Sequence, residues 1–430
     1  MNNNQFINWK NNKIIFFILY ITLIFGFYYN ENIAGGAIHD FNYHLNLISS
    51  FKSNFYNTLL NYKNFNTDHS PFYFIFLNLI NLFVDSTEAL RLIYLHICLL
   101  APLILYKVLI EIYNDCDKAI LFLISCIILL SPFFRSYAIW AGELNIVLIF
   151  LISSIYFFLK LIKENNNKKK YIYIFLNVLC FAIAAYFRPI NCLFSIYFFY
   201  KIFIKFKISK ELILFISVNI LLAFPALYYV FILENVFFNL FINYFYNPTI
   251  MLYSNNILII STIFLFYSVP FLHMNKSIIL KEYFILNKKN IFLVLITIML
   301  TFFLINNFNY NFLSDSIGGG IFYKISNYFF YNNVLFYIIC FFSMNFILQI
   351  MFKKNINDII LILIIIGLDP DVFIFHMTYD PLLLCLFLLL FENKIFRCLN
   401  KKNQKSFTKF ISIYSAGIFI IFSLKGILIN

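Results

Sequence analysis

The sequence is dominated by apolar runs of about 17–25 residues, which recur along its whole length with short polar stretches between them. A helix of that length crosses the hydrocarbon core of a bilayer, whereas a helix of a soluble protein needs a polar face at helical period. Only 12% of the 430 residues are charged and 62% are hydrophobic, which is not a soluble globular composition. The sequence therefore predicts an all-α fold, a polytopic transmembrane helical bundle of about 11–13 spans.

The distribution of charge indicates the topology of this bundle. The net charge of +13 could suggest a nucleic-acid partner, but Lys and Arg fall in short clusters between apolar runs, as in cytoplasmic loops. We therefore expect a lipid bilayer and no nucleic acid as partner. The bias of Lys and Arg to one side favours thirteen spans and is reversed if 72–84 is counted as a full span. The spans with predicted bounds are 14–29, 88–113, 119–134, 144–161, 171–187, 212–232, 291–305, 328–352, 359–368, 382–390 and 410–428, and two more precede the lysines at 201–210 and 276–289.

The stretch between the first two spans, Glu31 to Pro71, is predicted to be an extracytoplasmic loop. Residues 41–51 have mixed helical character and are expected to form an interfacial helix, and 72–84 is expected to be re-entrant or interfacial. Asp40 and His44 are four residues apart and would share one helical face. There the carboxylate could accept a proton from an incoming hydroxyl or orient the histidine; the alternative is a solvated polar face.

Further ionisable residues are predicted at the same side of the membrane, where their number favours a site because charge at membrane depth is costly. An arginine at a helix end could bind a phosphate or pair with Glu143, and Gly318–Gly320 ahead of Lys324 could form an anion-binding nest. The candidate substrate-binding residues are His69, Arg135, Glu143, Arg188, Lys324, His376 and Asp380. Asp68 is expected to cap the helix that follows it.

Several classes of chemistry have no motif in this chain. It lacks a Walker motif, GxSxG, HExxH and a dinucleotide fingerprint, which disfavours a nucleotide-driven enzyme. It also lacks a CxxC pair, so no metal ligands are assigned. No cofactor is predicted with certainty, and a divalent metal stays an open alternative.

Taken together, the loop, the topology and the outward arginines resemble the GT-C superfamily of integral membrane glycosyltransferases. The likeness is to the family 39 and protein mannosyltransferase-like branch and to the dolichyl-phosphate-glucose-dependent glucosyltransferases. It covers about residues 14–205 and rests on short motifs: Asp40 to His44, His69-Ser70-Pro71 followed by Phe72 and Tyr73, Ala89 to Arg91, Ser131-Pro132, and Arg188 to Asn191. Unlike many members of the superfamily, the chain has no second acid next to Asp40, and Glu143 is the nearest candidate for a second acidic residue.

The resemblance implies one integral membrane domain over 1–430. It would contain a GT-C-like catalytic module at 14–205, including the first extracytoplasmic loop 30–71, and a variable transmembrane module at 206–430. It also implies transfer of a sugar from a polyprenyl-phosphate-linked donor to a glycan, lipid or protein acceptor at the periplasmic or exterior face of the inner membrane. Asp40 would then be the general base, His44 would orient it or contact the acceptor, and Arg188, Arg135 and Lys324 would neutralise the leaving phosphate.

Two other classes of function remain open at this point. One is a transporter or flippase of lipid-linked saccharides, for which ionisable groups along a path through the membrane would be expected. The other is an outer-face polymerase of repeat units, which would use similar arginines but would not need Asp40.

Overall fold

The computed structural model describes residues 3–33, 36–65, 67, 69–84, 86–231, 249–276, 288–310, 318–353, 355–369 and 373–429. Within these ranges all regular secondary structure is helical, which confirms the predicted all-α class. The chain divides into two compact units, Met1–Leu240 together with Thr408–Asn430, and Phe241–Phe407. Asp68, which was expected to cap a helix, lies outside the described residues.

The first unit begins with the apolar helix α1 and continues with short helices. It also contains five of the eight helices that are long and apolar enough to cross a membrane, and most of a sixth. Its helices are α1 (Asn3–Tyr28), α2 (Ala37–Ser53), α3 (Phe55–Leu60), η1 (Tyr62–Phe65), α4 (Pro71–Asn81), α5 (Thr87–Cys98), α6 (Leu100–Ile112), α7 (Lys118–Cys126), η2 (Ile127–Leu130), α8 (Pro132–Ile139), α9 (Glu143–Lys163), α10 (Asn167–Phe187), η3 (Pro189–Leu193), α11 (Phe194–Phe206), α12 (Lys210–Phe231) and most of α21 (Gln404–Ile429).

The second unit is a smaller bundle in which α14 contacts five other helices, α16 to α20. Its helices are α14 (Ile250–Met274), α16 (Lys288–Asn306), α17 (Gly320–Phe330), α18 (Val334–Met351), α19 (Ile356–Gly367), η5 (His376–Thr378) and α20 (Leu382–Leu389).

The helices identify a multi-pass membrane protein. Eight helices in the described part of the chain are long and apolar enough to cross a membrane, or nine if the bent pair Lys118–Leu130 and Pro132–Ile139 is one span. A helix lies at each of the thirteen predicted positions. The number of helices that are long and apolar enough to cross a membrane is nevertheless below the predicted eleven to thirteen spans. Four of the predicted positions hold shorter apolar helices: Lys13–Tyr28, Asn290–Asn306, Ile356–Gly367 and His376–Leu389.

Three predicted boundaries are wrong for local reasons. The predicted helix 119–134 ends at Leu130, because Pro132 cannot donate to the preceding turn and Ser131 caps a new helix. The predicted helix 328–352 is divided into α17 and α18 at Tyr331, whose φ is 53°. Residues 250–255, the end of a loop expected over 235–255 after the predicted span 212–232, belong to α14. Thr249 caps this helix by accepting a hydrogen bond from Leu252 N at 3.2 Å.

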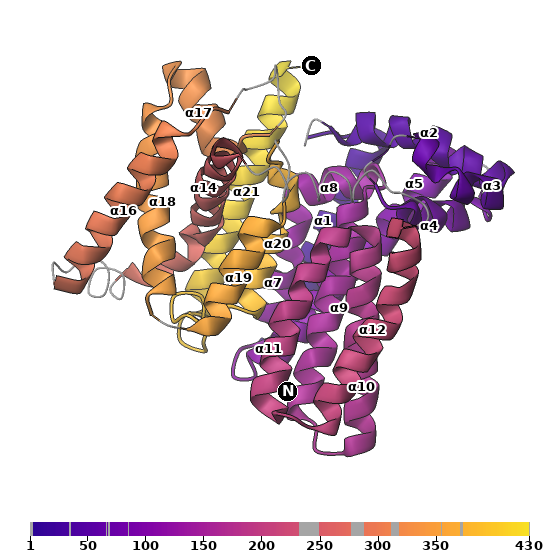
Figure 1. Cartoon of the computed structure of the whole chain (residues 1–430), viewed down its shortest axis with the longest axis horizontal. Helices are drawn as coiled ribbons and strands as arrows, with labels where there is room; N and C mark the ends of the chain where they lie inside the picture. Colours follow the sequence, from indigo (N-terminus) through magenta and orange to yellow (C-terminus); the bar gives the residue numbers. More distant parts are fainter. Residues whose placement is uncertain are drawn as a thin grey trace. The chain divides into compact units, whose positions relative to one another are not determined.

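In the first unit, short helices lie across one end of the longer ones. Figure 1 shows α2, α3 and α4 beside the end of the bundle formed by α9, α10 and α12, with α8 at the same end. The buried residues of α2 recur at helical spacing and form a face of the helix. Helix α2 contacts α4, and α4 in turn contacts α5 and α10. The predicted helices at 41–51 and 72–84 are thus present as α2 and the eleven-residue α4.

The break between η2 and α8 brings further side chains to this end of the unit. The two segments meet at an angle of 68°, and every residue of α8 is buried. The serine hydroxyl of Ser131 accepts a hydrogen bond from Phe134 N at 3.0 Å, and Pro132 occupies the first helical turn, where no backbone donor is needed. Arg135 and Tyr137 are consequently directed toward the first loop.

Candidate functional site

Asp40 lies in the first turn of α2, where a carboxylate is favoured by the helix dipole. It is half-buried, and its Oδ2 accepts a hydrogen bond from the hydroxyl of Tyr137 at 3.1 Å. Tyr137 comes from α8, so this contact joins the first loop to a helix 97 residues further along the chain. The predicted shared helical face of Asp40 and His44 is consistent with both residues lying in α2.

His44 and His69 form an edge-to-face pair, with ring centroids 4.4 Å apart and ring planes at 82°. His44 is 3% exposed, and its Nδ1 has no hydrogen-bond partner among the residues that the structure describes. Burial, and after it the charge of His69, lowers the pKa of His44 to about 2. His44 is therefore a neutral ring that packs against His69.

His69 is paired with Glu143, the first residue of α9. Its Nδ1 lies 3.1 Å from Glu143 Oε2, and the side chains of the histidine and the glutamate are 28% and 13% exposed. This contact with the carboxylate fixes the orientation of the imidazole ring. His69 precedes the capping residue Ser70, whose hydroxyl accepts from Phe72 N at 3.2 Å, so the start of α4 also sets its position.

The turn at 139–143 connects Tyr137 with Glu143 and therefore links the two contacts just described. Ala141 in this turn has a φ of 51°, which is uncommon for a residue with a side chain. Three buried side chains hold carbonyl groups of the turn: Arg91 Nε donates to Ile139 O at 2.9 Å, Tyr73 to Ala141 O at 2.5 Å, and Tyr94 to Gly142 O. These three paired carbonyls make a well-fixed turn.

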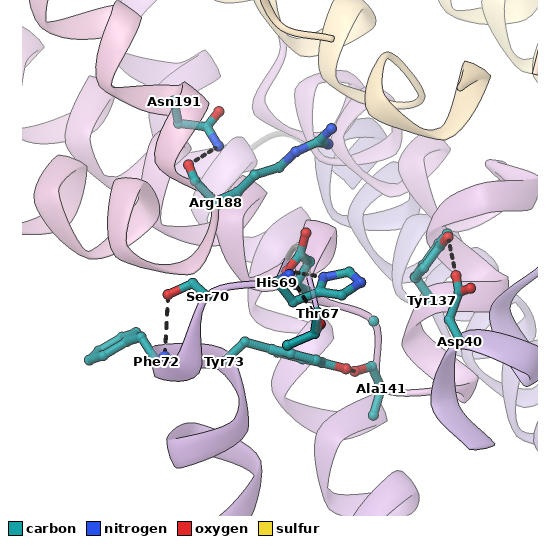
Figure 2. A network of polar contacts seen from close by, with 12 residues as sticks. Asp40, Thr67, His69, Ser70, Phe72, Tyr73, Tyr137, Ala141, Arg188 and Asn191 are labelled. Carbon is teal, nitrogen blue, oxygen red and sulfur yellow. Dashed lines mark hydrogen bonds and ion pairs between the residues drawn. The ribbon is translucent and has the colours of Figure 1, made fainter. Parts of the chain in front are cut away.

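Gly142 is required by the close approach of the Tyr137 ring to the turn. A Cβ atom at position 142 would lie 1.6 Å from Tyr137 Cδ1, and Gly142 N donates to Tyr137 O at 2.8 Å. The ring of Tyr137 is thus held against the backbone of the turn, and its hydroxyl is directed at Asp40 (Figure 2).

Arg135, predicted to bind phosphate, lies in a buried ion pair. Its Nε and Nη2 donate to the two carboxylate oxygens of Glu31 at 2.7 and 2.6 Å, and further hydrogen bonds join it to Thr22. Arg135 is 1% exposed. These contacts anchor the start of the first loop, and the phosphate-binding role of Arg135 stays a prediction that they do not support.

Arg188 lies at the end of α10, directly before η3, and is half-buried. Asn191 Nδ2 donates to Arg188 O at 3.0 Å, which fixes the backbone at this helix end. The guanidinium of Arg188 and the carboxylates of Asp40 and Glu143 act electrostatically on the Tyr137 hydroxyl. Figure 2 shows the extended Arg188 side chain together with His69, Tyr73, Tyr137 and Asp40.

The remaining three candidates belong to the second unit. His376 is 8% and Asp380 7% exposed, and His376 Nε2 is hydrogen bonded to the Tyr267 hydroxyl at 2.9 Å. The charge of Lys324 acts on His376. Gly318, Gly319 and Gly320 all have positive φ, and Gly319 N donates to Ile374 O at 3.0 Å, so one amide of the predicted anion nest already has a partner.

The sequence analysis missed several residues of the site. Tyr73, Tyr94 and Tyr137 donate to it, but 31 tyrosines occur in the chain and no local pattern distinguishes these three. Glu31 was placed in the first loop without a role. The Ala-Leu-Arg motif did include Arg91, whose guanidinium carbon lies 3.5 Å from the ring centroid of Trp140.

Within the described residues, no group of three or more His, Cys, Asp or Glu side chains is arranged to hold a metal ion. The network in the first unit therefore consists of the half-buried acid Asp40, the His69–Glu143 contact, the nearby Arg188 and the tyrosines that position them. Such a set can accept a proton, bind hydroxyl groups and stabilise negative charge. In comparisons with known proteins, no family model, no curated protein and no solved structure matches this chain.

Proposed function

We propose that this protein is a membrane glycosyltransferase that transfers a sugar from a polyprenyl-phosphate-linked donor to an acceptor hydroxyl. The acceptor would be a glycan, a lipid or a protein, and the reaction would take place at the extracytoplasmic face of the inner membrane. The observation that carries the proposal is the oriented carboxylate of Asp40, half-buried and within one network with His69, Glu143 and Arg188.

In the proposed reaction, the acceptor oxygen attacks the anomeric carbon while Asp40 takes its proton. The bond between that carbon and the phosphate oxygen breaks, and polyprenyl phosphate leaves with the electron pair. A single displacement inverts the configuration at the anomeric carbon, by the logic that applies to inverting glycosidases. A base that is ionised and already oriented lowers the cost of this proton transfer.

Arg188 is suited to the leaving phosphate, because a guanidinium is permanently charged and can make two parallel hydrogen bonds to it. His69, held by Glu143, is suited to a hydroxyl of the donor sugar or the acceptor. His44 packs on His69 and supports its orientation. Lys324, His376 and Asp380 stay candidate substrate-binding residues of the second unit.

The test is a transfer assay in proteoliposomes with radiolabelled polyprenyl-phosphate sugars. It compares the wild type with Asp40→Asn and with Asp115→Asn, the same substitution at an exposed acid between α6 and α7. We expect label in the acceptor fraction with the wild type and Asp115→Asn and none with Asp40→Asn. Full activity of Asp40→Asn would refute the assignment of the base. Label that crosses the bilayer without chemical change would instead identify a transporter.

A further inference from the structure

Tyr137 is the described residue that joins Asp40 to the fixed turn at 139–143. Its hydroxyl donates to Asp40 Oδ2 at 3.1 Å, and its side chain is 6% exposed. The ring has little room to move, because Gly142 approaches it so closely that a Cβ atom would overlap Cδ1. The donor is therefore held in place before any substrate binds.

The turn that holds Tyr137 is itself fixed from several directions. Its carbonyls accept hydrogen bonds from Arg91, Tyr73 and Tyr94, and Trp140 Nε1 donates to Glu31 O at 3.0 Å. These contacts surround the backbone that carries the tyrosine. A functional group supported in this way keeps its orientation better than one on a free loop.

Asp40 also lies among other titratable and charged groups, which together set its environment. His39 and His44 share its helix α2, His69 and Tyr73 come from the start of α4, Glu143 from α9 and Arg188 from the end of α10. Glu143 carries a charge that opposes ionisation of a neighbouring acid, whereas Arg188 favours it. A hydrogen bond donated to the carboxylate adds to the effect of Arg188, because it stabilises the ionised form.

We propose that Tyr137 is a positioning residue that keeps Asp40 ionised and oriented toward the acceptor hydroxyl. This inference rests on the proposed function, since it assigns to Asp40 the role of the base. The ionised carboxylate has two oxygens, and Tyr137 engages Oδ2.

A buried tyrosine could also donate to a carboxylate only to satisfy its own hydroxyl. The two roles differ in their consequences for pH. If Tyr137 only completes the packing, loss of the hydroxyl lowers stability and leaves the pH dependence of transfer unchanged. If it maintains the ionised base, loss of the hydroxyl moves the acid limb of the pH profile to higher pH, because more alkaline conditions are needed to ionise Asp40.

The experiment measures kcat/KM for sugar transfer against pH for the wild type, Tyr137→Phe and Tyr94→Phe. Tyr94 is a matched control, since it is also a buried tyrosine next to the turn, but its hydroxyl donates to the carbonyl of Gly142 and not to Asp40. We expect Tyr137→Phe to shift the acid limb upward by about one pH unit, the scale of one hydrogen bond to a partly solvated carboxylate. Tyr94→Phe should lower thermal stability and leave the acid limb unshifted.

A second measurement does not depend on catalysis. Carbodiimide labelling of Asp40, followed by mass spectrometry at a series of pH values, reports the protonated carboxyl group directly. The pH at half-labelling should rise in Tyr137→Phe and not in Tyr94→Phe. An unchanged labelling midpoint, or an unchanged acid limb, would overturn the role of Tyr137. If instead the midpoint shifts while Asp40→Asn remains fully active in transfer, Tyr137 acts on Asp40 but the proposed base is wrong.

Discussion

Removal of one partner from the Glu31–Arg135 ion pair tests how the first loop is anchored. The two residues are joined by two hydrogen bonds of 2.6 and 2.7 Å, and their side chains are 14% and 2% exposed. The Phe419 ring packs on the guanidinium, with 4.9 Å between the guanidinium carbon and the ring centroid. Glu31→Gln would leave the buried guanidinium without its counter-charge.

The size of the expected loss of stability follows from the burial of the two side chains. Breaking a buried pair by removal of one partner costs about 3–5 kcal/mol, because the remaining charge stays out of water without compensation. Glu31 is slightly exposed, so the lower end, about 3 kcal/mol, is expected for Glu31→Gln. In the double variant Glu31→Gln, Arg135→Met no charge is left unpaired, and its loss should be smaller than the sum of the two single losses by at least about 1 kcal/mol.

Trp140 provides a local probe for this measurement. Its indole Nε1 donates to Glu31 O, it is 5% exposed, and Trp9 is the only other tryptophan in the sequence. In a Trp9→Phe background, the fluorescence of Trp140 would follow equilibrium unfolding in mixed micelles with increasing SDS. The four proteins of the double-mutant cycle give the coupling energy directly.

Additive losses in this cycle would refute the ion pair as the anchor of the loop. The transfer assay then decides the other role of Arg135. A phosphate ligand predicts that Arg135→Met raises the KM for the lipid-linked donor at unchanged stability, whereas the buried pair predicts a loss of stability that Glu31→Gln reproduces.

Two further predictions concern the same site. Since the folded-state pKa of His44 is about 2, below its usual value of 6.5, the stability that its neutral form provides is complete above pH 6.5 and is lost as the pH falls below it. Between pH 7 and pH 5, His44→Gln should therefore lose less stability than the wild type, by up to about 1.4 kcal/mol per pH unit. Denaturant titrations at the two pH values measure both losses, and equal losses for the two proteins would contradict this. Gly142→Ala should lower the unfolding free energy by about 1–3 kcal/mol and reduce transfer, because its Cβ overlaps the Tyr137 ring. Thermal scans should compare this variant with Gly417→Ala, whose Cβ would meet no atom within 4 Å outside the nearby backbone of its own helix. Gly417→Ala is the matched control and should be neutral or stabilising.

The sequence was sufficient to predict the helices and the general place of the site, because both depend on local patterns. Apolar runs indicated the spans, and the spacing of Asp40 and His44 indicated a shared helix, present as α2. The helix after the first loop was expected to begin at 72 with Asp68 as its cap, whereas α4 begins at Pro71 and Ser70 caps it. Helix boundaries were wrong where a single residue decides them, as at Tyr331 with its positive φ.

The partners of the site residues could not be predicted, because they are set by packing between distant segments. Glu31 is 104 residues from Arg135, His69 is 74 residues from Glu143, and Asp40 is 97 residues from Tyr137. An arginine at the end of a predicted span suits a phosphate and a buried carboxylate equally well, and only the position of Glu31 distinguishes them. The roles of Tyr73 and Tyr94 also could not be predicted, because their hydroxyl groups donate to carbonyl groups of a turn that is far away in the sequence.

Helix α9 relates this network to the two faces of the membrane. Glu143 is its first residue, and Lys160 and Lys163 lie in its last turn, where both pair with Glu111 of α6. Its 21 residues extend over about 30 Å, the thickness of the hydrocarbon core, so these two ends belong to opposite faces. The lysine end continues into the basic stretch at 168–170, the pattern of a cytoplasmic loop. The positive-inside rule therefore supports the extracytoplasmic placement that we propose for Asp40, because Glu143, which belongs to the same network, lies at the end of α9 opposite to these lysines.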